Sequence, residues 1–285
     1  GSSAHCLFSI LPMPLYQAIV LAIVQGLTEF LPISSTAHLA LFPWFLGWED
    51  PGLTYDVALH AGTLVAVLVY FWRYWLEMAG LVLGRNWGGN PGLGLNRKLL
   101  WFLVAATIPA GLAGWFLEHH VEETFRSPLV IGVALIVVGM IMWAGERLGR
   151  QQVELQQVSF LDSIVVGLAQ AIAIIPGVSR SGITMTAGML RGMKRETAAR
   201  FSFLLSTPII GGAALKEGVN ILRDGITHDM VLPFVVGVVV AAVVGYAVIA
   251  FLIRYLERGT FKIFVVYRLA LGVLVLALGW GLRHV

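Results

Sequence analysis

The chain has little charge and almost no cysteine. Of its 285 residues only 12% are charged, whereas 58% are hydrophobic, and Cys6 is the single cysteine. One cysteine excludes an intramolecular disulfide and a cysteine metal cluster. The formal net charge of +3 is too small to indicate a nucleic-acid partner. Because a soluble domain of this length needs a more polar surface, the composition predicts an integral membrane protein.

Apolar segments recur along the chain after Met13 and predict one all-α membrane domain of residues 13–285. Residues 1–12, which begin GSS, are expected to be an added leader or an unstructured start. About ten helical segments can be marked from hydrophobicity. They are Leu15–Leu31, Ser35–Leu46, Val57–Leu76, Leu99–Leu117, Leu129–Ala144, Leu161–Ile175, Gly182–Leu190, Thr197–Leu215, Met230–Ile253 and Ile263–Leu282.

Two of these segments, Ser35–Leu46 and Gly182–Leu190, are too short to cross a bilayer. Each follows a longer segment across a break that contains proline and serine. Backbone that leaves a helix at membrane depth must be buried in protein or line a wet cavity. We therefore predict two re-entrant helix–break–helix pairs, with the other segments, roughly six, spanning the membrane.

The two breaks resemble each other. QGLTEFLPISST begins at Gln25, and QAIAIIPGVSRS begins at Gln170. Three segments long enough to span follow each break, which reverses the membrane orientation of the second half. This pattern is typical of an inverted-topology repeat, with the site where the breaks meet. The repeats are expected at about 13–146 and 158–285.

The basic residues support this layout, because most of them fall on the side that the positive-inside rule makes cytoplasmic. The first break then enters from outside and the second from inside. The cytoplasmic loops carry Arg73, Arg85, Arg97, Lys98, Arg147, Arg150, Arg191, Lys194, Arg195, Arg200, Arg254, Arg258 and Lys262. The opposite loops carry Arg126, Lys216, Arg223 and Arg283.

The second break, PGVSRSG, has the composition of an anion site. Gly177 permits a tight turn, and Ser179 and Ser181 offer hydroxyls where the next helix begins with free N–H groups. Arg180 adds a forked donor that suits phosphate oxygens. In the alternative reading, Arg180 pairs with a buried carboxylate and the serines only cap the helix.

The first break follows an amide and a carboxylate on one helical face. Gln25 and Glu29 are four residues apart, and a carboxylate at membrane depth is costly and often functional. Glu29 could orient a histidine or bind a divalent cation through oxygen.

Beyond the proline come the hydroxyls of Ser34, Ser35 and Thr36, and then His38. Ser35 and His38 share a face if the helix restarts at Ser35. A hydroxyl beside an imidazole can activate a nucleophile or relay a proton. The alternative is a helix cap at Ser34 or Ser35 and a histidine that is hydrogen-bonded within the fold.

Three further features carry weaker signals. His60 lies in a spanning segment and could line the cavity or bond another helix. His119 and His120, beside acidic residues, are expected in an outside loop that could bind metal, although a solvated loop is favoured. Arg268 in the last span is expected to pair internally.

QGLTEFLPISSTAH and PGVSRSG, in this order and separation, resemble the two signature motifs of the bacterial undecaprenyl-pyrophosphate phosphatase family of the bacitracin-resistance type. The resemblance covers essentially the whole chain after Met13. It implies hydrolysis of undecaprenyl pyrophosphate to undecaprenyl phosphate and inorganic phosphate, which recycles the lipid carrier for peptidoglycan synthesis. It also implies a multi-pass protein of the bacterial inner membrane, with a site open to the periplasm and a divalent cation (Mg²⁺ or Ca²⁺). A homodimer is a separate expectation.

Carried onto this sequence, the resemblance makes Glu29 the acidic group, which binds metal or assists proton transfer. Ser35 is the nucleophile or a phosphate ligand, and His38 is a base or the alternative nucleophile. Gln25 stands where many members have glutamate, so a second carboxylate is in doubt there. Arg180 would clamp the pyrophosphate. The remaining substrate-binding candidates are Ser34, Thr36, His60, Gly177, Ser179 and Ser181.

A transporter or flippase of an anionic polyprenyl phosphate is the alternative, since paired broken helices are common in transporters. The group of Glu29, Ser35 and His38 distinguishes the two functions. A carrier needs an anion clamp but neither a nucleophile nor a proton relay.

Overall fold

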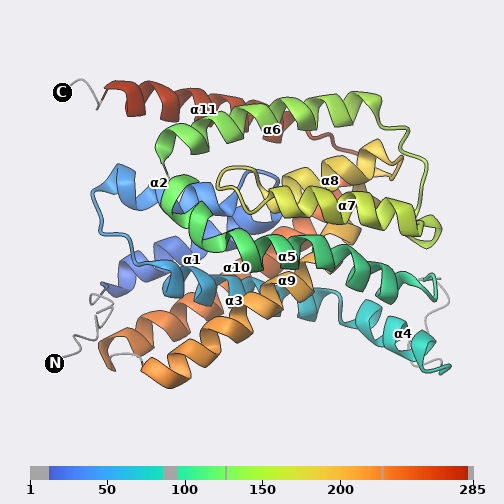
Figure 1. Ribbon diagram of the computed structural model, residues 1–285, viewed down its shortest axis with the longest axis horizontal. Helices are drawn as coiled ribbons and strands as arrows, with labels where there is room; N and C mark the ends of the chain where they lie inside the picture. Colours follow the sequence, from blue (N-terminus) through green and yellow to red (C-terminus); the bar gives the residue numbers. More distant parts are fainter. Residues whose placement is uncertain (1–12, 86–94, 126, 226–227, 282–285) are drawn as a thin grey trace.

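The computed structural model describes the chain except for residues 1–12, 86–94, 126, 226–227 and 282–285 (Figure 1). The expected leader, Arg126 and Arg283 therefore lie outside the described residues. The part described contains eleven α-helices and a short 3-10 helix. They are α1 (Leu15–Phe30), α2 (Ser35–Leu46), α3 (Leu53–Tyr70), α4 (Trp72–Val82), α5 (Leu99–Phe125), α6 (Pro128–Leu148), η1 (Leu155–Gln157), α7 (Phe160–Ile172), α8 (Arg180–Leu190), α9 (Arg195–Asp224), α10 (His228–Leu256) and α11 (Lys262–Gly281).

The helices confirm an all-α membrane protein. Within the described residues, five helices are long and apolar enough to span: α5, α6, α9, α10 and α11. A sixth span is formed if α3 and α4 are taken together, although they are bent by 68°. The two expected helix–break–helix pairs are also present, as α1 with α2 and α7 with α8.

Two boundaries expected from the sequence are wrong. The segment Val57–Leu76 is not one helix, because the chain turns at Phe71 and α4 leaves in a new direction. The expected outside loop around His119 and His120 is helical, since α5 continues to Phe125. The side chains of residues 118–125 are not among those that the structure describes.

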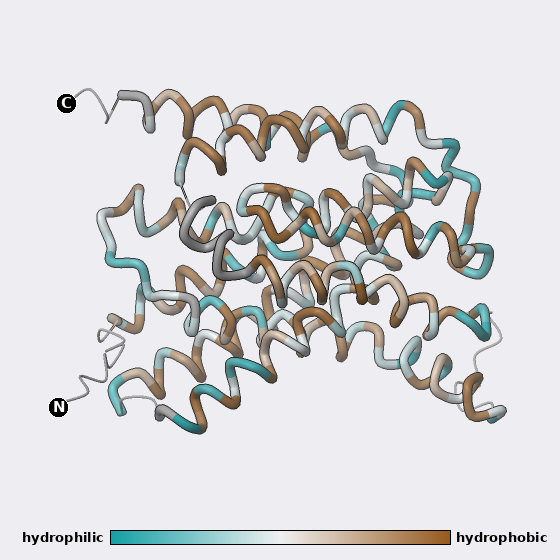
Figure 2. Tube along the Cα trace, viewed as in Figure 1, coloured by the Kyte–Doolittle hydropathy of each residue, from teal (hydrophilic) through white to brown (hydrophobic). Residues whose placement is uncertain are grey.

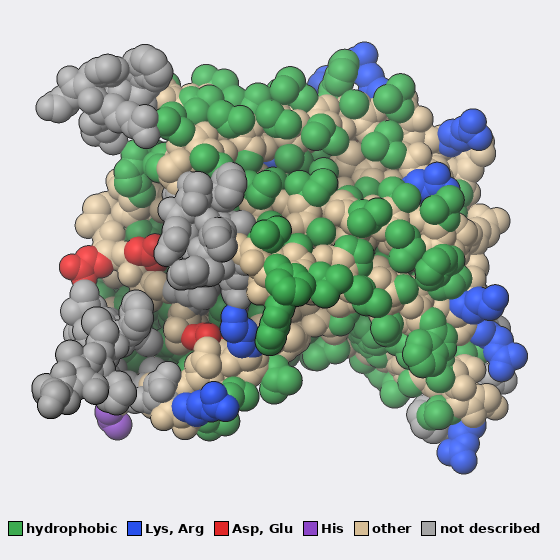
Figure 3. All heavy atoms as spheres, viewed as in Figure 1, with side chains coloured by type: hydrophobic (Ala, Val, Ile, Leu, Met, Phe, Trp, Pro, Cys, Tyr) green, Lys and Arg blue, Asp and Glu red, His purple; other side chains and the backbone are tan. Residues whose placement is uncertain are grey.

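The surface has the polarity of a protein surrounded by lipid. Hydrophobic residues line the middle of the helices, and hydrophilic residues gather in the connections at both ends (Figure 2). Large apolar side chains such as Trp115, Phe116 and Leu222 are mostly exposed, which only a hydrocarbon environment makes favourable. On the face in Figure 3, most basic side chains lie at one end of the helices, the end at which α4 lies. This asymmetry agrees with the expected charge distribution.

Proline ends α1 at the first break, and serine starts the next helix at both breaks. Leu31 is extended, with ψ of 140°, as expected for the residue before a proline. Ser34 and Ser179 hold φ values of 78° and 70°, which are uncommon outside glycine. Their hydroxyls accept hydrogen bonds from the N–H groups of Ala37 and Gly182, at 3.4 and 3.1 Å. Two serines in the same unusual conformation therefore cap α2 and α8.

The capping serines show how the two halves correspond. The separation from Gln25 to Ser34 equals that from Gln170 to Ser179, although the prolines are offset by one position. The packing is also reciprocal. α1 packs on α10 while α7 packs on α5, and α8 packs on α6 while α2 contacts α11 through His38 and Tyr267. Each re-entrant pair thus packs on spans of the other half, as an inverted repeat requires.

A close backbone approach holds α7 against α5. A Cβ atom on Gly167 would lie 2.3 Å from the carbonyl oxygen of Ala106, whereas one on Gly114 would meet nothing within 4 Å. Only glycine fits at the first position because the obstacle is backbone and cannot rotate away.

We expect Gly167→Ala to lower the free energy of unfolding by about 1–3 kcal/mol, the usual effect of forcing extra atoms into a packed contact. Thermal unfolding of the detergent-purified protein measures this. Gly114→Ala is the matched control in α5 and should not lower the unfolding temperature. Equal effects of the two substitutions would contradict the close approach.

Candidate active site

The two breaks meet through direct contacts. Arg180, the first residue of α8, donates from Nη2 to Oε1 of Glu29 near the end of α1. Ser181 Oγ donates to the carbonyl oxygen of Leu31, at 3.1 Å. The meeting point predicted from the repeat is therefore confirmed by hydrogen bonds between the halves.

Glu29 is the centre of a cluster with Gln25, Ser35, His60 and Arg180, which we call the Glu29 cluster. Its side chain is buried, and the residue is only 5% exposed. Its Oε2 accepts hydrogen bonds from Ser35 Oγ at 2.5 Å and from Gln25 Nε2 at 3.0 Å. His60 Nε2 lies 3.4 Å from the same oxygen, and its Nδ1 bonds the carbonyl oxygen of Asp56 at 2.7 Å. The carboxylate thus accepts hydrogen bonds from its own helix, from α2 and from α8, and His60 of α3 lies beside it.

The expected pairing of Ser35 with His38 is not formed. α2 does restart at Ser35, but the Ser35 hydroxyl bonds Glu29 instead. His38 bonds the Ser34 carbonyl through Nδ1 and the Tyr267 hydroxyl through Nε2, both at 2.7 Å. His60, the weaker candidate, is the histidine beside Glu29. A shared helical face brings side chains within reach but does not determine which partner each one takes.

The alternative that Arg180 pairs with a buried carboxylate is confirmed in part, because Arg180 pairs with Glu29. Its Nη1 donates to the carbonyl oxygen of Ser206, at 3.3 Å. A guanidinium has five N–H donors, so these two bonds leave others for a ligand. Its side chain is 15% exposed, against 4% for Glu29, which makes Arg180 the more accessible partner.

The remaining phosphate-ligand candidates surround the starts of α2 and α8. Ser179 Oγ and Ser181 Oγ are 3.3 Å apart, and Ser34 Oγ and Thr36 Oγ1 are 3.2 Å apart. The serines are buried, whereas Thr36 is exposed. Gly177, with φ of 91°, makes the turn that precedes the Ser179 cap. The first turns of α2 and α8 thus lie where the two breaks meet, and the free N–H groups of a helix start favour binding of an anion.

Arg268 is the residue whose role the sequence did not reveal. It is fully buried in α11, and it donates to backbone carbonyl oxygens of both breaks: those of Pro32, Gly177 and Val178. The expectation of an internal partner is confirmed, but the partners are main-chain atoms. Main-chain partners leave no signal in a sequence, so no carboxylate pattern could have indicated them.

A divalent cation has few protein ligands at this place. Among the described residues, no three side chains of histidine, cysteine, aspartate or glutamate come together as a metal site. In the described part of the chain, Glu29 is the one carboxylate of the cluster, and Gln25 Oε1 is buried without a hydrogen-bond partner. Mg²⁺ is often held by one or two protein carboxylates together with substrate phosphates. Glu29 and Gln25 therefore fit a divalent cation only if phosphate oxygens of a bound ligand supply further coordination.

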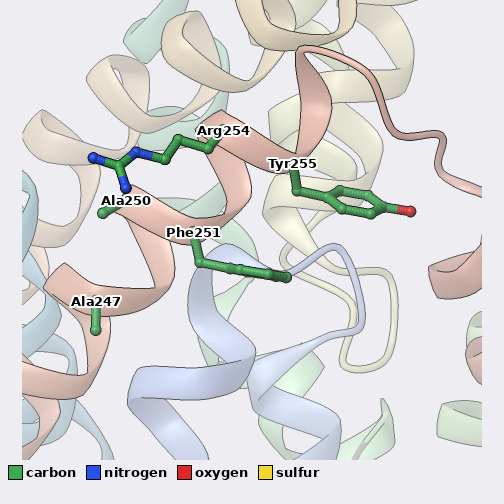
Figure 4. Close-up of a pocket in the computed structure, with 5 residues that line it drawn as sticks. All are labelled: Ala247, Ala250, Phe251, Arg254 and Tyr255. Atoms are coloured by element: carbon green, nitrogen blue, oxygen red, sulfur yellow. The ribbon is translucent and has the colours of Figure 1, made fainter.

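A cavity of about 520 Å³ opens elsewhere, along the end of α10 (Figure 4). Ala247, Ala250, Phe251, Arg254 and Tyr255 line it. It contains none of the residues predicted to act on a ligand, so the candidate site remains the Glu29 cluster.

We expect the Glu29–Arg180 pair to couple strongly in stability. Glu29→Gln and Arg180→Gln should each lower the free energy of unfolding by about 3–5 kcal/mol, because each leaves a buried charge unpaired. The double variant should lose less than the sum. Chemical unfolding of the four proteins in detergent gives the coupling energy. Effects that add within about 0.5 kcal/mol would contradict a direct pair.

Comparison with known proteins places the chain in a family. Residues 18–274 match the family model described as bacitracin resistance protein BacA. A protein of Moorella thermoacetica named undecaprenyl-diphosphatase is 52% identical over 270 residues, which cover 94% of this chain and 99% of that protein. A protein of the same name from Desulforudis audaxviator is 53% identical over 264 residues, covering 92% and 97%. A third, from Pelotomaculum thermopropionicum, is 48% identical over 266 residues, covering 93% and 97%. With its two broken helices meeting at Glu29 and Arg180, the chain belongs to the BacA family.

Proposed function

We propose that this membrane protein hydrolyses undecaprenyl diphosphate to undecaprenyl phosphate and inorganic phosphate, and that the reaction takes place at the Glu29 cluster. The family and the names of its relatives support the activity. The single observation that carries the site is the hydrogen bond of 2.5 Å from Ser35 to Glu29, beside Arg180. Phosphoryl transfer needs a nucleophilic hydroxyl, a base and a positively charged group that binds phosphate, and Ser35, Glu29 and the Arg180 guanidinium are of these kinds.

Ser35 is the attacking group in this proposal, and Glu29 is its base. The Ser35 oxygen attacks the terminal phosphorus, and its proton passes to Oε2 of Glu29. The bond from that phosphorus to the bridging oxygen breaks and releases the polyprenyl phosphate. Water then hydrolyses the phosphoserine and releases inorganic phosphate. His38 is the less suitable nucleophile, because both of its ring nitrogens have hydrogen-bond partners within the fold.

The second break holds the diphosphate. The free N–H donors of Arg180 and the first-turn N–H groups of α8 neutralise charge on the phosphate oxygens. The prenyl chain stays in the hydrocarbon, while the breaks bring polar groups to membrane depth. His60 stands beside Glu29 and orients its carboxylate.

The protein is a multi-pass membrane protein by its apolar helices and family. The excess of basic residues near α4 supports placing that end in the cytoplasm of the bacterium (Figure 3). On this orientation the first break enters from the periplasmic side of the inner membrane, and the site opens there. Assembly into a homodimer stays a prediction that mass measurement in detergent tests.

We expect Ser35→Ala to lower kcat by about 10³-fold or more, since the attacking atom is lost. Phosphate release from farnesyl diphosphate by purified protein measures this, beside Arg180→Ala, which should also lose most of its activity. Ser163→Ala is the matched control, because Ser163 is buried and its hydroxyl bonds, among the residues described, only the Ser159 carbonyl at the start of α7. Normal turnover in Ser35→Ala with none in His38→Ala would make His38 the nucleophile instead.

A divalent cation held jointly by the protein and the phosphate ligand leads to a separate prediction. If Glu29 and Gln25 bind Mg²⁺ or Ca²⁺ only together with phosphate oxygens, a chelator should abolish phosphate release and the cation should restore it. The cation alone should leave the unfolding temperature unchanged, because one carboxylate binds it weakly. Strong stabilisation by the cation without a phosphate ligand would contradict a shared site.

A further inference from the structure

Arg268 has an unusual set of partners for a buried charge. Its side chain is fully buried, and no carboxylate of the described residues forms an ion pair with it. Its Nη2 donates to Gly177 and Val178 carbonyl oxygens at 2.8 and 3.1 Å, and its Nη1 donates to that of Pro32 at 3.4 Å. Two further bonds, both of 3.3 Å, reach the carbonyl oxygens of Ala134 and Leu135 in α6.

These bonds do more than satisfy the guanidinium. Pro32 belongs to the first break, and Gly177 and Val178 belong to the second, so one side chain joins backbone from both halves of the repeat. In a trans peptide the carbonyl and the following N–H point in opposite directions. Bonding the Val178 carbonyl therefore turns the N–H of Ser179 away from Arg268 and sets the peptide plane just before the cap of α8.

We propose that Arg268 is a positioning residue, which holds the two breaks at the spacing that brings Ser35 and Arg180 to the two oxygens of Glu29. Only the kinetic consequence of this role rests on the proposed function. A planar fork of five donors can reach carbonyl groups in two breaks and in α6 at once. Lysine keeps the charge, but it has only three donors on a single atom.

The proposal predicts a loss of turnover in Arg268→Lys without a matching loss of binding. Misplacing reacting groups by about 1 Å can cost roughly 100-fold in rate. We therefore expect kcat for farnesyl diphosphate to fall by about that factor, while KM changes little. Arg191→Lys is the matched control, because Arg191 follows the other end of α8 and its guanidinium bonds the Asp162 carboxylate. It should keep the wild-type kcat.

Hydrogen exchange separates positioning from general loosening. In Arg268→Lys, peptides that cover residues 31–37 and 177–183 should exchange faster together, while peptides from α10 should exchange as in wild type. Wild-type kcat in the variant, faster exchange throughout the protein, or failure of the variant to fold would each overturn the positioning role. The exchange comparison needs no enzymatic activity. If the wild-type protein released no phosphate, the proposed function would be contradicted. The exchange comparison would still decide whether Arg268 positions the two breaks.

Discussion

Backbone that leaves a helix inside a membrane must find hydrogen-bond partners within the protein, and the centre of this structure follows from that constraint. Ser34 and Ser179 cap the helices that restart after the breaks. Arg268 bonds carbonyl oxygens that the breaks leave without helical donors. Arg268 both satisfies the breaks and joins them, so the stability of the fold and the geometry of the site are linked.

A second consequence concerns the buried charges. Glu29 and Arg180 come from different halves of the chain, and each would be costly to bury without the other. Their pairing compensates both of these buried charges. In the proposed reaction, the N–H donors of Arg180 that Glu29 and Ser206 do not use bind the diphosphate, and Glu29 serves as the base. Arg180 would then contact both the base and the substrate, which is a simple physical link between binding and catalysis.

The repeat explains why one site is built from unlike residues. The positions that follow the two capping serines are occupied by Ser35 in the first half and Arg180 in the second. Reciprocal packing, with α1 on α10 and α7 on α5, brings these positions to the same place. A symmetric scaffold therefore presents a hydroxyl from one side and a guanidinium from the other, and an in-line phosphoryl transfer needs that asymmetry.

The membrane character, the two broken helices and most residues of the candidate site could be predicted from the sequence alone. Hydrophobic length, proline at the breaks and matching motifs are local properties, so each can be read from neighbouring residues. Tertiary structure decided which side chains meet. It placed His60 rather than His38 beside Glu29, divided Val57–Leu76 at Phe71, and gave Arg268 its main-chain partners. Helical spacing limits what can come within reach, but the partner of a polar group depends on how distant helices pack, and that information is not local.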